Sequence, residues 1–99
     1  MSEETIRVVA RFVAKTDRIE DLKRVLTDFV APTRGEEGCI TYDLLQSISD
    51  PTDITFVEEW TNEAALEKHL ASEHINRGRA NLPELLEGEG DIRVYRQIA

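Results

Sequence analysis

Both histidines of this 99-residue chain follow its single tryptophan closely, and two adjacent glutamates directly precede that tryptophan. Glu58, Glu59 and Trp60 end an alternating segment, and His69 and His74 follow within a helical pattern. An imidazole has an unperturbed pKa of about 6.5, which suits proton transfer at neutral pH. An indole adds a large flat surface with one N–H donor. The candidates for catalysis are therefore His69, His74 and Trp60.

His69 shares the apolar face of its predicted helix with Leu66, because residues three or four positions apart in a helix are neighbours. That face points at the sheet, toward the strand side that carries Phe56, Glu58 and Trp60. A histidine in this place can act as a base or hydrogen-bond partner for a phenolic hydroxyl. The alternative is a core histidine that has one backbone or carboxylate partner and no catalytic role.

His74 follows His69 by five residues, which on one continuous helix places the two roughly 140° apart around the axis. The two histidines can share a metal ion only if the helix breaks near Ser72. We therefore expect no metal, and a thiolate site is excluded because Cys39 is the single cysteine. After such a break, His74 can line a pocket as a proton carrier. Otherwise it is a surface or capping histidine.

Three further side chains are candidates for substrate contact: Tyr42, Phe56 and Glu58. Phe56 and Trp60 project from the same strand side as Glu58, where an unpaired carboxylate is costly. Glu58 either orients His69 or binds the substrate hydroxyl; the alternative is a structural pair with an arginine such as Arg34. Trp60 either stacks on an aromatic substrate or simply closes the core under a helix.

Regular elements must position these residues, and the first two are a strand and a helix. Residues 5–14 alternate between two faces and are rich in β-branched types, which predicts a strand. Asp17 then resembles a helix N-cap, and an apolar stripe at helical spacing runs on to Val30. Pro32 and Gly35 are predicted to end this helix.

Two strands follow and form a predicted hairpin. The first opens at Gly38, and its expected inner face consists of Ile40, Tyr42 and Leu44. The Tyr42 ring therefore belongs to the core, with its hydroxyl at the cavity edge. Residues 49–53 read as a turn, and residues 54–60 form the partner strand.

The last part of the chain supplies a second helical region and a final strand. Thr61 or Asn62 caps a helix that runs to Leu70, and Ser72 restarts a short helix through residues 74–79. Residues 82–86 are predicted to be partly helical, and residues 92–98 to be a strand with Ile92 and Val94 on one face.

The resulting order, β-α-β-β-α-β, is the ferredoxin-like arrangement of an α+β fold. Both helical regions should cover one face of a four-stranded antiparallel sheet. The other face still carries Val9, Val13 and Val57, and Glu59 also points there, where Arg7 and Arg11 of the first strand are its expected partners. Sheet-to-sheet pairing would cover this face, so we expect a homodimer of the dimeric α/β-barrel type.

Composition bounds the class of protein. Ninety-nine residues, 40% hydrophobic and 32% charged, make a single globular domain over residues 1–99. A net charge of −8 without any basic block argues against nucleic acid and membrane surfaces as partners. The sequence has no apolar run that approaches a membrane span, and its single cysteine cannot form an intrachain disulfide. We therefore expect a cytoplasmic protein.

Several segments together resemble the antibiotic biosynthesis monooxygenase family, especially its small quinol-monooxygenase-like members. They occur in family order and cover nearly the whole chain. The matching runs are Pro32-Thr33-Arg34, Glu36-Glu37-Gly38-Cys39, Tyr42-Asp43-Leu44, Glu58-Glu59-Trp60, Leu66-Glu67-Lys68-His69-Leu70, Ser72-Glu73-His74 and Leu82-Pro83-Glu84-Leu85-Leu86.

The resemblance implies a dimeric barrel that oxidises phenolic or quinol substrates with O2 and needs no flavin, haem or metal. A small aromatic substrate and O2 are then the partners, and His69 is the expected base. A related haem-degrading branch uses an asparagine, a tryptophan and a histidine where this chain has Phe12, His69 and Arg79. Haem cleavage is therefore not expected.

Two other readings stay open, since one fold can host many functions. The first is a dimeric module that binds a small aromatic molecule without catalysis, which would show a stable complex without oxygen uptake. The second is a cofactor-free isomerase or cyclase that acts on a polyketide-like substrate, whose turnover would not depend on oxygen.

Overall fold

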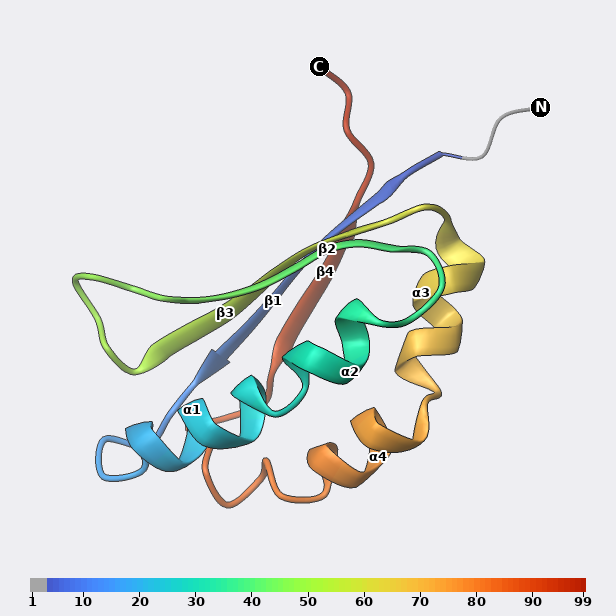
Figure 1. The fold of residues 1–99 in the computed structure, drawn as a ribbon. Coiled ribbons are helices and arrows are strands. Elements are labelled where there is room, and N and C mark those ends of the chain that lie inside the picture. Colours follow the sequence, from blue (N-terminus) through green and yellow to red (C-terminus); the bar gives the residue numbers. More distant parts are fainter. Residues whose placement is uncertain (1–3) are drawn as a thin grey trace.

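The structure, a computed structural model, describes residues 4–99 and contains one four-stranded antiparallel sheet in the order β2-β3-β1-β4. The strands are β1 (Ile6–Val13), β2 (Cys39–Gln46), β3 (Asp53–Trp60) and β4 (Asp91–Tyr95). Strand β1 pairs with both β3 and β4, and β2 and β3 form a hairpin (Figure 1). This order confirms the ferredoxin-like α+β fold.

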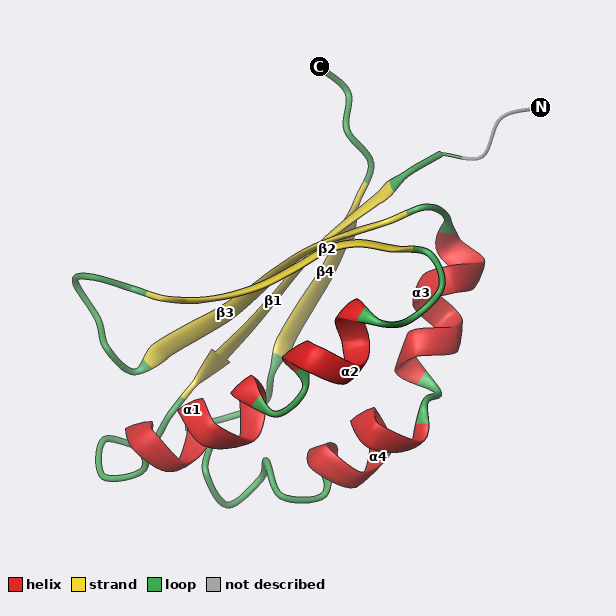
Figure 2. Cartoon of the chain, viewed as in Figure 1, coloured by secondary structure: helices red, strands yellow, loops and turns green. Residues whose placement is uncertain are grey.

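Within residues 4–99, four helices cover one face of the sheet: α1 (Ile19–Thr27), α2 (Val30–Arg34), α3 (Glu63–Leu70) and α4 (Glu73–Arg79). Helices α1 and α2 connect β1 to β2, while α3 and α4 connect β3 to β4 (Figure 2). None of the described residues forms a helix on the opposite face of the sheet (Figure 1). The cavity described below therefore lies between this single helical layer and the sheet.

The core follows from the alternation of β1 and β3. On β1 the buried side chains are Ile6, Val8, Ala10 and Phe12, and on β3 they are Ile54, Phe56, Glu58 and Trp60. Leu22 and Leu26 of α1 pack on this surface and are fully buried, as their helical spacing predicts. Phe56 lies at the centre, stacked on Tyr42 with ring centroids 4.6 Å apart.

The first helical region differs from the prediction at both ends. The N-cap residue of α1 is Arg18, not Asp17, and it makes no side-chain cap hydrogen bond. Pro32 does not end a helix, because it lies in the first turn of α2, where a missing N–H costs no intrahelical bond. Gly35 is the C-cap residue of α2, as predicted.

The inner face predicted for β2 is wrong at Ile40. The pairing of β2 with β3 shifts between Cys39 and Thr41, which leaves Ile40 46% exposed. A bulge adds one residue to a strand and so reverses the alternation on one side of it. Tyr42 keeps its predicted inward position and is 2% exposed.

The final quarter of the chain has less helix and a shorter strand than predicted. Residues 82–86 form turns rather than helix, and Leu86 bridges to Ala14 instead. Strand β4 ends at Tyr95, so residues 96–98 do not belong to it. Ile92 and Val94 do share a face, opposite Ala10 and Val8 of β1, but both are about half exposed.

The face of the sheet without helices mixes apolar and charged side chains. Val9, Val13 and Val57 are partly buried there, and Arg7 pairs with Glu59 at 3.7 Å, as predicted. Arg11 instead pairs with Asp53 at 2.7 Å. Among the described residues, no helix is both long and apolar enough to cross a membrane.

Candidate functional site

The break between α3 and α4 determines where the two histidines lie. Asn62 caps α3 by accepting a hydrogen bond from the Ala65 backbone N–H, and Ser72 is the N-cap residue of α4. The Ser72 hydroxyl donates to the His69 carbonyl at 2.6 Å, which helps to hold the turn. The helix thus breaks at Ser72, which meets the condition set out above for the two histidines to approach each other, and the two imidazole centroids lie 6.1 Å apart.

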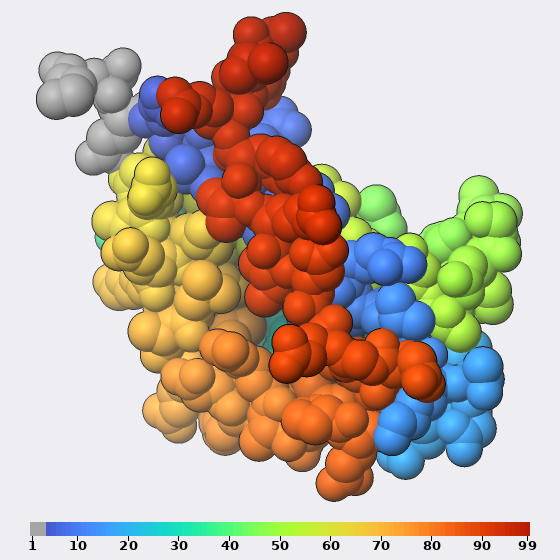
Figure 3. Space-filling model, turned by 180° about the vertical axis from the view of Figure 1, so that it is seen from behind, coloured from blue at the N-terminus to red at the C-terminus, as the bar shows by residue number. Residues whose placement is uncertain are grey.

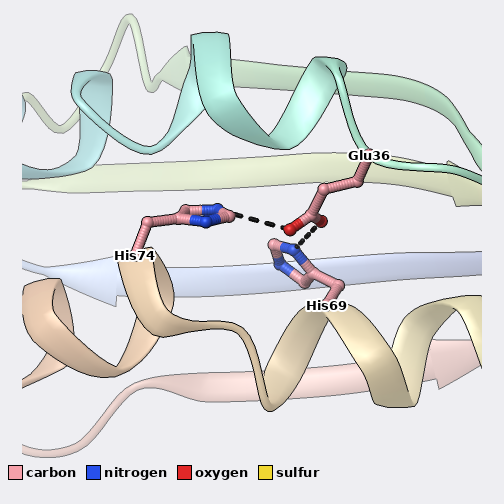
Figure 4. A group of neighbouring side chains, drawn as sticks. All are labelled: Glu36, His69 and His74. Carbon is pink, nitrogen blue, oxygen red and sulfur yellow. Dashed lines mark hydrogen bonds and ion pairs between the residues drawn. The ribbon is translucent and has the colours of Figure 1, made fainter.

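Glu36, in the loop between α2 and β2, joins the two histidines. Its Oε1 lies 2.6 Å from Nδ1 of His69, and its Oε2 lies 3.5 Å from Nε2 of His74 (Figure 4). The same Nε2 atom lies 3.1 Å from the hydroxyl of Thr33, which is fully buried. The three side chains therefore form a continuous polar cluster that connects α3, α4 and the loop before β2.

The charges at this cluster favour a neutral His69 with a defined tautomer. Burial lowers the pKa of His69 below 6.5, and the hydrogen bond and charge of Glu36 oppose that shift. A carboxylate can only accept, so the Nδ1 atom of His69 must carry the hydrogen. The lone pair then lies on Nε2, which leaves this nitrogen able to accept a proton.

A cavity of about 630 Å³ lies between the helices and the sheet, and His69 is part of its wall. Figure 3 shows the hollow from outside, between β4 in red and the yellow-to-orange helices α3 and α4. The cavity wall is mostly apolar and includes three of the predicted contact residues, Tyr42, Phe56 and Glu58. A wall of this kind, with a few polar groups, suits a small, largely apolar ligand.

Two of the predicted catalytic residues do not line this cavity. Trp60 is fully buried, and its ring centroid lies 4.7 Å from that of His69. It therefore packs against the His69 ring without lining the cavity. His74 lies instead beside a separate depression at the surface, near Phe29 and Gly78. Stacking of Trp60 on a substrate is therefore not available in this arrangement.

Glu58 has a different partner from either one predicted. Its Oε1 accepts a hydrogen bond of 2.8 Å from Nε1 of Trp60, whereas Arg34 binds the Tyr42 carbonyl and the Asp43 carboxylate. Burial raises the pKa of Glu58 to about 7, the Trp60 bond lowers it in part, and the nearby charge of Glu36 raises it further. Burial therefore makes the Glu58 carboxyl much easier to protonate than an exposed glutamate.

Tyr42 is held as a neutral phenol. Burial raises its pKa above the ordinary value of 10, and the charge of Glu58 adds to this, while a hydrogen bond with Thr33 opposes it. Its ring stacks on Phe56 and meets the His69 ring edge-on at 5.5 Å. Tyr42 therefore contributes an aromatic wall next to His69.

Two residues of this region were not among the predicted site residues. Glu36 and Glu37 are adjacent, and nothing in the sequence distinguishes the one that reaches His69. Arg79 lines the cavity from the end of α4 and brings a positive charge to it. Its position depends on the direction of α4 after the break at Ser72, which local sequence patterns do not determine.

Fold and cavity together define a class: a ferredoxin-like α+β domain with an apolar pocket under its helices. The family model for antibiotic biosynthesis monooxygenase matches residues 5–81, and the chain belongs to this family.

Three relatives show how far the likeness extends. The chain is 36% identical over 81 residues to "Putative monooxygenase Rv0793" of Mycobacterium tuberculosis, and the match covers 82% of this chain and 79% of that protein. The crystal structure of PA3566 from Pseudomonas aeruginosa superposes with a TM-score of 0.92 at 32% identity, over 100% of this chain and 99% of that one. An uncharacterized Synechocystis protein, sll1783, is 27% identical to this chain over 95 residues. The match covers 96% of this chain but only 65% of the Synechocystis protein.

Proposed function

We propose that this chain is a cofactor-independent monooxygenase that oxidises a quinol or polyphenol with O2. The observation that carries the proposal is the position of His69, in the wall of a mostly apolar cavity, with Nδ1 bound to Glu36. Family membership and the names of relatives support the monooxygenase class. The aromatic side chains of Tyr42 and Phe56 in the same wall support an aromatic substrate.

The first step is removal of a phenolic proton by Nε2 of His69. Burial keeps the imidazole neutral and ready to accept, and Glu36 stabilises the imidazolium that forms. Arg79 brings a positive charge to the cavity wall, where it favours the phenolate. Glu58, when protonated, can donate a hydrogen bond to a second substrate oxygen.

The electron-rich anion then reduces O2 directly, so the substrate supplies the electrons that a cofactor would otherwise provide. One electron passes from the phenolate to O2, which gives a substrate radical and superoxide. Recombination at a ring carbon, with a proton, forms a hydroperoxide that loses water to leave a new carbonyl. A dihydroxyarene and O2 thus become a hydroxyquinone and water. Separation of the two radicals instead leads to the quinone and hydrogen peroxide.

The proposal also includes a homodimer and a cytoplasmic location. Val9 and Val57 on the sheet face without helices, together with Leu45, which is 52% exposed, support pairing of two sheets. Cys39 is the only cysteine, so the chain cannot form an intrachain disulfide, and proteins of the cytoplasm rarely contain one.

Oxygen uptake by chelator-treated protein tests the proposed function. The protein is supplied with a panel of hydroquinones and polyphenols, and spontaneous autoxidation is subtracted. We expect saturable uptake for at least one substrate. A stable complex without uptake would contradict the proposal and favour a binding module. Turnover that continues unchanged without oxygen would contradict it in favour of an isomerase or cyclase.

A further inference from the structure

We propose that Glu36, His69 and His74 form a binding site for a divalent transition-metal ion. Each of the three side chains offers one ligand atom, and these atoms all lie within 4.8 Å of one another. Two imidazoles and one carboxylate are a donor set that suits Zn²⁺, Co²⁺ or Fe²⁺. Figure 4 shows the three side chains converging on one point from separate segments of the chain.

The separations are close to those that an ion requires. A tetrahedral ion with bonds of about 2.0–2.2 Å holds its ligand atoms about 3.3–3.5 Å apart. Oε2 of Glu36 is already 3.5 Å from Nε2 of His74. Oε1 of Glu36 and Nδ1 of His69 are 2.6 Å apart, the separation of a hydrogen bond whose proton the ion would replace. The ligand atoms of His69 and His74 lie within 4.8 Å of each other, so the two imidazoles must move closer together to complete the site.

The backbone holds the ligands before any ion arrives. His69 is in the last turn of α3, His74 is in the first turn of α4, and Ser72 between them is the N-cap residue of α4. On an unbroken helix the two imidazoles would point in directions about 140° apart. The break is thus what brings them to a common carboxylate, which His69 meets through Nδ1 and His74 through Nε2.

The surroundings admit a cation. Glu36 and His74 side chains are 21% and 22% exposed, and a cavity of about 430 Å³ reaches Glu36 and His69 beside Glu37. Lys68 also lines this cavity and opposes a cation, whereas the net charge of the whole chain, −8, favours one. The Thr33 hydroxyl, 3.1 Å from Nε2 of His74, must give up that contact when the ion binds.

An ion in this site would change the role of His69. With Nδ1 bound to the metal, the neutral ring carries its hydrogen on Nε2 and can donate a hydrogen bond but not accept a proton. Metal binding and the proposed base role therefore exclude each other at His69. This consequence alone rests on the proposed function, whereas the site itself does not.

Titration of metal-free protein with Co²⁺ tests the site without any enzyme assay. We expect saturable binding with a visible d–d absorption band, displaced by Zn²⁺. His74→Ala and Glu36→Gln should each weaken Co²⁺ binding by at least about 10–100-fold, the loss seen even when an outer partner of a metal ligand is removed. Glu37→Gln, the adjacent carboxylate, should bind as the wild type does.

Two outcomes would overturn the site. One is the absence of a d–d band in the wild type at millimolar Co²⁺. The other is Co²⁺ affinity that is equal in wild type and His74→Ala. His74 is partly exposed, so its removal should leave the fold intact, which circular dichroism can verify. Because the readout is binding, its failure is distinct from a failure of the proposed oxidation.

Discussion

Oε1 of Glu36 accepts a hydrogen bond from Nδ1 of His69 at 2.6 Å, across 33 positions of sequence. The bond places a carboxylate beside a buried imidazole that also forms part of the cavity wall. In enzymes this arrangement fixes the tautomer and orientation of a histidine base and stabilises its charged form. Glu36 is therefore a positioning residue for the proposed base.

Replacement of Glu36 by glutamine tests this role. The amide of Glu36→Gln carries no charge to stabilise the imidazolium, so kcat should fall while KM changes little. Removal of the base altogether costs about 10²–10⁴-fold, and the loss in Glu36→Gln should be smaller than that of His69→Ala. Glu37→Gln removes the neighbouring charge and should keep wild-type kcat. Equal kcat in the two glutamine variants would contradict the positioning role.

Glu58 should make stability fall as pH rises toward neutrality. Its folded-state pKa of about 7 lies above the ordinary 4.5, because the buried site disfavours the charged form. Between these two values the folded state holds a proton that the unfolded state has lost, so the free energy of unfolding decreases with pH. At about 1.4 kcal/mol per pKa unit, the loss is on the order of 3 kcal/mol.

Urea unfolding of wild type and Glu58→Gln between pH 5 and pH 8 measures this effect. The variant can still accept the Trp60 hydrogen bond but does not titrate, so it should gain stability relative to wild type as pH rises. Taking the difference removes the contributions of all other titrating groups. Parallel curves for the two proteins would show that Glu58 does not have a raised pKa.

Gly78 should not tolerate a side chain, although it lies within a helix. A Cβ atom there would lie 1.9 Å from the ring of Phe29, which is itself buried in the cavity wall. Alanine normally favours a helix by about 1 kcal/mol over glycine, but overpacking costs about 1–3 kcal/mol. Gly78→Ala should therefore be less stable than wild type in chemical unfolding.

Gly35 provides the matched control for this substitution. It has a negative φ, and a Cβ atom there would meet its nearest neighbour, the Pro32 carbonyl oxygen, at 3.5 Å, an ordinary contact. Gly35→Ala should be neutral or slightly stabilising. If Gly78→Ala were as stable as Gly35→Ala, the close packing of α4 on Phe29 would be wrong.

The sheet face without helices should be covered by a second copy of the chain. Sedimentation equilibrium at micromolar concentration should give about twice the monomer mass of 11.3 kDa. Val9→Glu puts a charge at the centre of this face and should shift the mass toward the monomer. Arg77→Glu, on the exposed surface of α4, should leave the mass at that of the dimer. A wild-type monomer would rule out the dimer.

The fold could be predicted from the sequence because local patterns and short connections determine most of it. Alternation gives β1 and β3, and the capping residues Asn62 and Ser72 mark α3 and α4. The errors occur where local rules compete. Pro32 is tolerated in a first helical turn, and a bulge beside Ile40 reverses the alternation there.

The site was less predictable, because its contacts join residues far apart in the chain. His69 was placed on the correct face by helical spacing alone. Its partner Glu36 was missed, since a loop carboxylate has no periodicity that reveals its direction. The Glu58–Trp60 bond links two residues of the same strand face, but the sequence favoured an arginine partner for Glu58 slightly over His69 or a substrate hydroxyl.

The most direct test of the central claim is oxygen uptake by His69→Ala, measured on a substrate that the wild type oxidises. We predict a fall in kcat of about 10²–10⁴-fold, with partial recovery when free imidazole is added to fill the vacated space. Full turnover by His69→Ala without imidazole would contradict the assignment of His69 as the base.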